Sequence, residues 1–177
     1  MKGKLLGKKF FNRDADAVAC DLIGKFIVRK TGGGEVAAMI TETEAYVGPH
    51  DLASHASKGR TERTKVMFGA PGTLYVYLVY GMHLMLNIVT REEGYPAAVL
   101  VRAVTGATGP GRAAKFLHIT KNMNGKLAGR KTGLWIKDWG IRIRRGAIRR
   151  TPRVGVDYAG PVWAKKKLRF ILDESGR

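Results

Sequence analysis

A glutamate near the end of an apolar strand is the clearest candidate for chemistry in this sequence of 177 residues. In the segment Ile40–Tyr46, strand alternation predicts that Glu42, Glu44 and Tyr46 share one side. A carboxylate beside an aromatic ring, at the edge of a core strand, could serve as a general base. A glutamate that only faces solvent is the commoner outcome of such a pattern, so spacing alone leaves both interpretations open.

The other reactive residue types do not form a known metal or nucleophile motif. His50 and His55 are five residues apart in a predicted loop, without an HExxH or Cys/His pattern. The single cysteine, Cys20, excludes an internal disulfide framework. The stretch Gly106–Gly111 is compatible with a phosphate-binding turn before a helix and equally with a plain loop-to-helix junction. We therefore expect no metal site.

An exposed aromatic tip is predicted between two strands at residues 73–79 and 83–89. Tyr75 and Tyr77 alternate onto one face, as core residues do. Tyr80 lies at the turn and is followed by Met82, where a large side chain is difficult to bury. On a basic protein such a tip is a candidate wedge between base pairs.

The charge of the chain points to a polyanionic partner. Lys and Arg number 32 against 14 Asp and Glu, a net charge of +18. Residues 101–177 contribute +15 of this excess, and one short run alone could be a solvated face. Because the excess is sustained over this whole half, duplex DNA or RNA is the better explanation. The residues expected to contact phosphates are Arg142, Arg144 and Arg145.

The elements needed to position these residues predict one domain over residues 1–177, of class α+β. We expect a curved, mostly antiparallel β-sheet with flanking short helices. Helices are predicted at 15–23 and 112–119, and strands at 25–29, 36–40, 73–79, 83–89, 97–104, 134–137, 141–143, 154–156 and 168–172, with 146–152 as a connection. The longest uncharged apolar stretch, Leu74–Val89, is too short to span a bilayer and no signal peptide is evident. We expect a cytoplasmic protein, associated with the nucleoid if it is prokaryotic, with no membrane partner.

Five segments carry a resemblance to a known family. In chain order they are TETEAYVGPHDLASHA, GRTERTKVMFGAPGTLYVYLVYGMHLMLNIVT, AAVLVRAV, GPGRAAKFLHI and PRVGVDYAGPVWAKKKLRF. Together they resemble the alkyladenine (3-methyladenine) DNA glycosylases, and E-A-Y with PGT-YVY-YGM-N is specific to that family. The resemblance implies a monofunctional hydrolase of the N-glycosidic bond, which starts base-excision repair on damaged double-stranded DNA. The lesions implied are 3-methyladenine, 7-methylguanine, hypoxanthine and ethenoadenine, each flipped out of the duplex.

The resemblance also implies roles for individual residues. Glu44 would deprotonate a water that attacks the anomeric carbon, Arg102 would help to hold this water, and the backbone carbonyl of Val156 would complete its site. A neighbouring guanidinium favours the ionised carboxylate that this role requires. No lyase lysine and no cofactor is implied, because water is the nucleophile. We expect a monomer with no obligate protein partner.

The same resemblance assigns the base pocket. Tyr46, His55 and Tyr77 would sandwich the flipped base, and electron-poor alkylated purines suit such π faces. Asn87 would exclude the exocyclic amine of guanine. Tyr80 would fill the gap left in the duplex, with Met82 beside it.

Two alternative functions are compatible with parts of the sequence. A non-catalytic basic nucleic-acid-binding protein, of the ribosome-associated type, would explain the charge but would leave Glu44 and Tyr46 without a role. A helix–hairpin–helix glycosylase is suggested by Gly109–Arg112, but that family requires an aspartate after a GPD-like hairpin, and this sequence has none.

Overall fold

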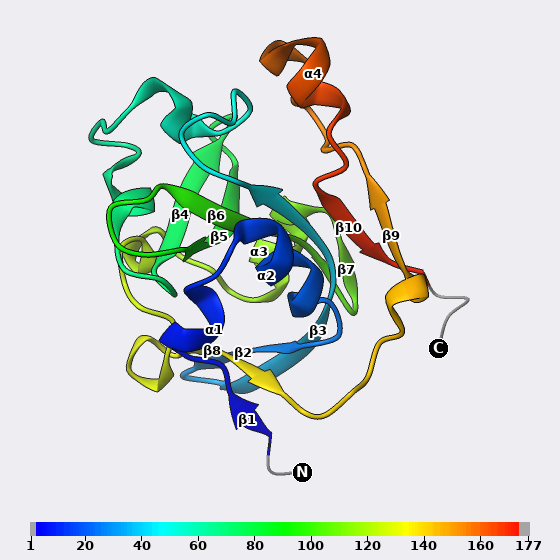
Figure 1. The fold of residues 1–177 in the computed structure, drawn as a ribbon. Helices are drawn as coiled ribbons and strands as arrows, with labels where there is room; N and C mark the ends of the chain where they lie inside the picture. The colour runs from blue at the N-terminus through cyan, green and yellow to red at the C-terminus, as the bar shows by residue number, and fades with distance from the viewer. Residues whose placement is uncertain (1–2, 174–177) are drawn as a thin grey trace.

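A long antiparallel sheet flanked by short helices forms the protein. The computed structural model describes residues 3–173, and its class is α+β, as predicted (Figure 1). The strands are β1 (Lys4–Leu5), β2 (Phe26–Thr31), β3 (Gly34–Tyr46), β4 (Leu74–Val79), β5 (His83–Thr90), β6 (Ala97–Val104), β7 (Ala107–Thr108), β8 (Leu134–Asp138), β9 (Ile148–Thr151) and β10 (Arg169–Leu172). The helices are α1 (Lys8–Phe11), α2 (Ala15–Leu22), α3 (Pro110–Phe116) and α4 (Gly160–Lys165). Within residues 3–173, no helix is long and apolar enough to cross a membrane.

Strand β3 organises the sheet. The main order is β1-β8-β2-β3-β6-β5-β4, and every pairing is antiparallel. The first part of β3, Gly34–Met39, pairs with β2 as an antiparallel hairpin, in agreement with the strands predicted at 25–29 and 36–40. Its second part, from Ile40 to Tyr46, pairs with β6, and Glu42 to Glu44 also pair with β10. The end of β3 is thus an interior strand, which holds its side chains rigidly.

The two faces of the sheet have different coverings. The hydroxyl of Thr43 donates to the carbonyl of Ala19 in α2 over 2.9 Å, so α2 covers the Thr43 face of β3. In Figure 1 this helix lies across β3, and its buried side includes Val18 and Leu22. Because successive side chains of a strand point to opposite faces, Glu44 lies on the face away from α2.

The hairpin β4–β5 projects two large side chains. Tyr80 and Gly81 both have positive φ, at 50° and 68°, and Met82 N donates to Val79 O over 3.1 Å. Positive φ at both central positions is typical of tight hairpin turns, and it is strained for a tyrosine. As whole residues, Tyr80 and Met82 are 89% and 72% exposed. The predicted exposed tip is therefore confirmed.

Three segments differ from the sequence-based prediction. Segments 141–143 and 154–156 are not strands, and 148–151, which we expected to be a connection, forms β9. Strand β9 has the sequence IRRT and pairs only with β10 among the described residues. Strand β9 has no alternation of apolar and polar residues. It lies at the edge of the sheet, where side chains pack against one neighbouring strand and the sequence is less constrained.

Candidate active site

A row of residues across four strands forms the floor of the candidate site. Glu44 on β3 lies opposite Leu100 on β6, Leu100 lies opposite Asn87 on β5, and Asn87 lies opposite Tyr75 on β4. Residues two positions along a strand share its face, which adds Tyr46, Arg102, Met85 and Tyr77 to the same side. The antiparallel register therefore brings together residues that are far apart in the sequence.

A cavity of about 570 Å³ opens over this row. Loops from 53–67 and 154–158 form its other walls, contributing His55, Arg63, Val154 and Tyr158. The hairpin tip reaches its mouth through Tyr80. Tyr158 is held across the cavity wall, because its hydroxyl donates to Ala53 O over 2.8 Å. This volume is in the range of small-molecule sites.

Glu44 is fully buried at the wall of this cavity. Its Oε1 accepts a hydrogen bond from Val154 N over 2.8 Å and lies 3.4 Å from an Arg102 guanidinium nitrogen. Its Oε2 accepts from the Tyr46 hydroxyl over 3.1 Å. All three partners line the cavity. A solvated edge glutamate is thereby excluded in favour of a buried, oriented carboxylate.

Burial raises the pKa of the Glu44 carboxyl above its usual 4.5. Desolvation is the largest effect, and Arg102, the Val154 amide, the Tyr46 hydroxyl and Arg153 oppose it. A carboxylate with a raised pKa is a stronger base than one in water. These donors and cations partly offset the desolvation and so favour the ionised form.

Arg102 links two carboxylates at an irregular point in the sheet. Its Nε donates to Glu42 Oε1 over 2.8 Å, while another nitrogen faces Glu44. Arg169 on β10 also donates to Glu42 Oε1, over 2.6 Å. The register of β3 with β6 shifts between Ile40 and Thr43, beside Arg102. Such bulges re-aim side chains, and here the guanidinium lies along the row.

Aromatic rings cluster at the other end of the row. The rings of His55 and Tyr77 are 4.7 Å apart and nearly perpendicular, and those of Tyr75 and Tyr77 are 5.1 Å apart. His55 Nδ1 lies within hydrogen-bond distance of the Tyr75 hydroxyl, at 3.1 Å. Burial raises the pKa of the Tyr77 hydroxyl well above its usual 10. These rings form a neutral π surface inside the cavity.

A buried ion pair fixes the loops that carry the site. Arg153 donates to both carboxylate oxygens of Asp51, over 2.6 and 2.8 Å, and to Ala45 O over 2.9 Å. Both side chains are fully buried. The Arg153 guanidinium also lies 4.8 Å from the centre of the Tyr46 ring. Since Val154 follows Arg153, the pair sets the position of the amide that donates to Glu44.

The structure brings together most of the residues singled out from the sequence. Glu44, Tyr46, His55, Tyr77, Asn87, Arg102, Val156 and Tyr80 line the cavity or contact residues that do. The carbonyl of Val156 accepts a hydrogen bond from Ala159 N over 2.9 Å, and it is the amide of Val154 that contacts Glu44. Sequence reasoning missed Arg63 and the pair Asp51–Arg153, whose members are 102 residues apart and carry no shared pattern.

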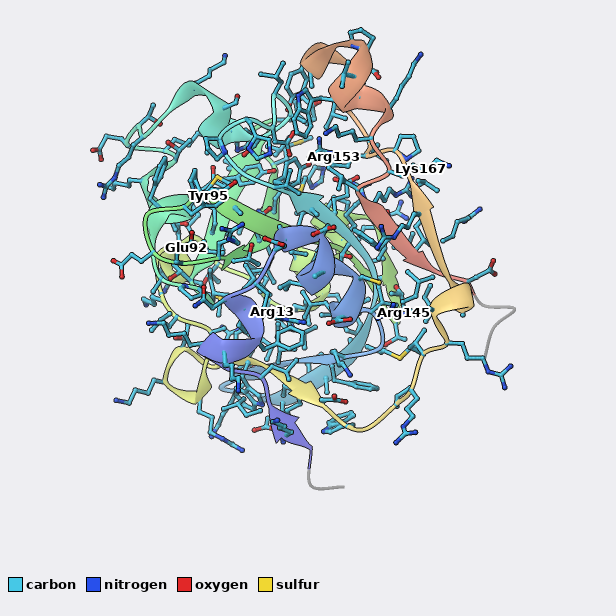
Figure 2. All side chains as sticks on the ribbon, in the orientation of Figure 1. Arg13, Glu92, Tyr95, Arg145, Arg153 and Lys167 are labelled. Atoms are coloured by element: carbon cyan, nitrogen blue, oxygen red, sulfur yellow. The ribbon has the colours of Figure 1, made fainter. Side chains whose placement is uncertain are left out.

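This cavity is not lined by the arginines expected to contact phosphates, Arg142, Arg144 and Arg145. Arg142 and Arg145 line a second hollow beside α2. Figure 2 shows Arg145 and Arg153 at opposite ends of the β9–β10 ribbon, and Arg153 is the one at the end near α4. The end of the ribbon near Arg153 is also the end near Glu44, because Glu44 on β3 lies opposite Arg169 on β10 in the strand register.

Comparison with known proteins identifies the family. The model of the methylpurine-DNA glycosylase family matches residues 9–108 and 105–176. A protein of Myxococcus xanthus is 45% identical over 96% of this chain and 91% of its own length. Proteins of Methanocella arvoryzae and Legionella pneumophila (strain Lens) are 44% and 41% identical, over 88% and 96% of this chain and 86% and 95% of their own lengths. The names of all three propose a 3-methyladenine DNA glycosylase.

The chain belongs to the methylpurine-DNA glycosylase family. This membership confirms the resemblance noted from the sequence and supports a DNA glycosylase whose substrate is DNA. The cavity of this family member has a buried carboxylate at one end and clustered aromatic rings at the other.

The histidine of this methylpurine-DNA glycosylase cavity is expected to remain neutral far below the usual range. Burial, with a smaller contribution from Arg63, lowers the pKa of His55 from 6.5 to about 4. As the pH falls, His55 becomes protonated in the unfolded chain near pH 6.5 and in the folded protein only near pH 4. The free energy of unfolding therefore decreases as the pH falls from 6.5 towards 4. An NMR titration of the ring protons should give a midpoint for His55 near pH 4. A midpoint near 6.5 would show that the ring is solvated and that the cavity is open at this point.

Proposed function

We propose that the protein hydrolyses the N-glycosidic bond of alkylated or deaminated purines that are flipped from duplex DNA into the cavity. The observation that carries this proposal is the buried Glu44 carboxylate, held by Arg102, Val154 and Tyr46 at the wall of a ring-lined cavity. Alkylated purines have electron-poor rings and a weakened glycosidic bond, which suits a π surface and a base.

In the proposed reaction Glu44 takes a proton from water while the water oxygen bonds to the anomeric carbon. The bond from that carbon to the purine nitrogen breaks, and its electron pair leaves with the base. A purine that carries a positive charge from alkylation departs as a neutral molecule. Arg102 balances the charge of the carboxylate beside the reacting water. The product is an abasic site in an intact strand, with no lyase step.

The flipped base is proposed to rest among Tyr46, His55 and Tyr77. Neutral His55 does not repel a cationic purine, whereas a protonated imidazole would. At the cavity mouth, Tyr80 and Met82 project from a strained turn and are free to enter the duplex. Inserted apolar side chains of this kind stabilise an unstacked duplex, and so favour the extruded nucleotide.

Asn87 is proposed to exclude guanine by its position in the floor. Its Nδ2 donates to Tyr75 O over 3.2 Å, so the buried amide is held in one orientation. Removing the amide in Asn87→Ala makes room for an exocyclic amine. The ratio of guanine release to hypoxanthine release is expected to rise roughly tenfold, measured in single-turnover reactions on matched duplexes. The exposed Asn122→Ala is the matched control, and equal ratios in the two variants would count against this role.

A panel of damaged duplexes tests the proposed activity. Strands containing 3-methyladenine, 7-methylguanine, hypoxanthine or ethenoadenine are incubated with the protein and then treated with alkali. The proposal requires release of free base, and strand breaks that appear only after alkali. A basic protein that merely binds nucleic acid leaves every strand intact, and breaks without alkali would reveal a lyase.

A further inference from the structure

A second hollow, of about 690 Å³, lies beside α2, and its lining includes four isoleucines, five cationic side chains and two aspartates. We call it the basic hollow and define it by Ile23, Ile143, Ile148, Arg142, Arg145 and Arg150. The wall is held in place because Ile143 packs on Gly24, where even a Cβ atom would lie 2.5 Å from its Cγ1. Figure 2 shows Arg13 and Arg145 on the side of the molecule that carries α2.

The basic hollow lies on the opposite side of the sheet from the candidate active site. The hydrogen bond from Thr43 to Ala19 places α2 against one face of β3, and Glu44 points to the other. The outward side of α2, including Asp16 and Cys20, lines the basic hollow. A duplex that engages Tyr80 and the cavity therefore leaves the basic hollow open.

The charges of the basic hollow are unbalanced. Arg13 and Lys25 at its margin are neutralised by Asp21 and Asp138, over 2.8 and 2.7 Å. Arg142, Arg145 and Arg150, by contrast, take part in none of the ion pairs between described residues, although the Arg150 guanidinium lies 4.9 Å from the centre of the Phe170 ring and Asp16 also lines the hollow. Clustered unpaired arginines repel one another, and an anionic partner removes that repulsion.

The isoleucines that line the basic hollow favour one of two kinds of anionic partner. Phosphates of a duplex lie on convex ridges and present no apolar group to a concave surface. A peptide with aliphatic or aromatic side chains between carboxylates satisfies both the isoleucines and the arginines. Ile143 and Ile148 are only partly buried by the rest of the chain, so a peptide side chain can cover them further.

Strand β9 offers a way to hold such a peptide. Ile148 and Arg150 alternate onto the same side of β9, and both line the basic hollow. In the described part of the chain β9 pairs with β10 alone, so its other edge has unused backbone donors and acceptors. Extended peptides bind to such edges by adding a strand, and side-chain pockets beside the edge give them specificity.

We propose that the basic hollow and the free edge of β9 bind an acidic, extended segment of a partner protein while the opposite face is on DNA. The segment alternates carboxylates, which pair with Arg142, Arg145 and Arg150, with apolar side chains that lie on Ile143 and Ile148. This surface brings a second protein to the site of a lesion without competing for the duplex.

The test uses fluorescence anisotropy with a labelled ten-residue peptide that alternates Asp or Glu with Leu and Phe. The whole protein should bind this peptide, and Arg142→Glu/Arg145→Glu should weaken binding at least roughly tenfold through two charge reversals. Lys121→Glu/Lys126→Glu is the matched control, because it makes the same change in net charge at exposed sites elsewhere. The second variant, Ile148→Asp, should weaken binding without changing any arginine.

Competition with an undamaged 20-base-pair duplex separates the two partner classes. The proposal requires that the peptide stay bound when the duplex saturates the protein. Displacement by the duplex would overturn it and make the basic hollow a nucleic-acid surface. Equal peptide affinity in the hollow variants and the lysine control would overturn it as well. Circular dichroism checks that each variant is folded. The Ile148→Asp variant tests the apolar contacts of the peptide, and the arginine variant tests its charge contacts.

Discussion

Glu44→Gln is expected to lower single-turnover base excision by roughly 10²–10⁴-fold while lesion-duplex affinity stays within about threefold. The amide oxygen of glutamine can still accept the hydrogen bond that Val154 N donates to Oε1. The amide cannot take a proton from water, so only the chemical step is lost. Excision is measured on a hypoxanthine duplex with enzyme in excess, and affinity by gel shift on the same duplex.

Glu92→Gln is the matched control for this prediction. Glu92 is exposed and pairs with Arg91 outside the cavity, so the same atom exchange there should leave excision unchanged. Turnover by Glu44→Gln at the rate of Glu92→Gln would remove Glu44 from the mechanism. Loss of lesion binding in Glu44→Gln would instead indicate that the carboxylate acts in binding the base.

Arg153→Met is expected to lower the free energy of unfolding by about 3–5 kcal/mol, because it leaves a buried Asp51 carboxylate without its cation. The loss extends to the site: Arg153 also binds Ala45 O and lies over Tyr46. Urea unfolding of the variant measures the change. Arg149→Met, at an exposed position of β9, is the control and should change stability by less than about 0.5 kcal/mol.

The double variant Asp51→Asn/Arg153→Met separates the charge from the shape of the pair. An asparagine keeps the side-chain oxygen that accepts from Ala53 N and carries no charge. The double variant should therefore be more stable than Arg153→Met alone, even though it lacks two native side chains. If Arg153→Met is as stable as Arg149→Met, the pair does not hold these loops together.

Local patterns of sequence were sufficient to predict the elements that carry the site. Alternation placed Glu44 and Tyr46 on one face of a strand, and a turn between two apolar runs placed Tyr80 at an exposed tip, as the structure confirms. Both are properties of a few consecutive residues. The predicted helix at 15–23 likewise depends on local spacing and agrees with α2.

Features that depend on distant residues could not be predicted in this way. Whether Glu44 is buried depends on Val154 and Arg102, which reach it from other parts of the chain. The pair of Asp51 with Arg153 joins two loops, and neither loop has a periodic pattern. The expected strand at 154–156 is a bend instead, with Gly155 at a φ of 71°, and it presents the Val154 amide to Glu44.

The pH dependence of 7-methylguanine excision tests the central claim, that an ionised Glu44 activates the water. This base is already cationic and leaves as a neutral molecule, so its departure needs no proton from the enzyme. The single-turnover rate should rise tenfold per pH unit through the pKa of Glu44, which lies above 4.5, and then remain constant. Glu44→Gln should lack this rise. A rate that does not change with pH in the native protein, or the same rise in Glu44→Gln, would contradict the account.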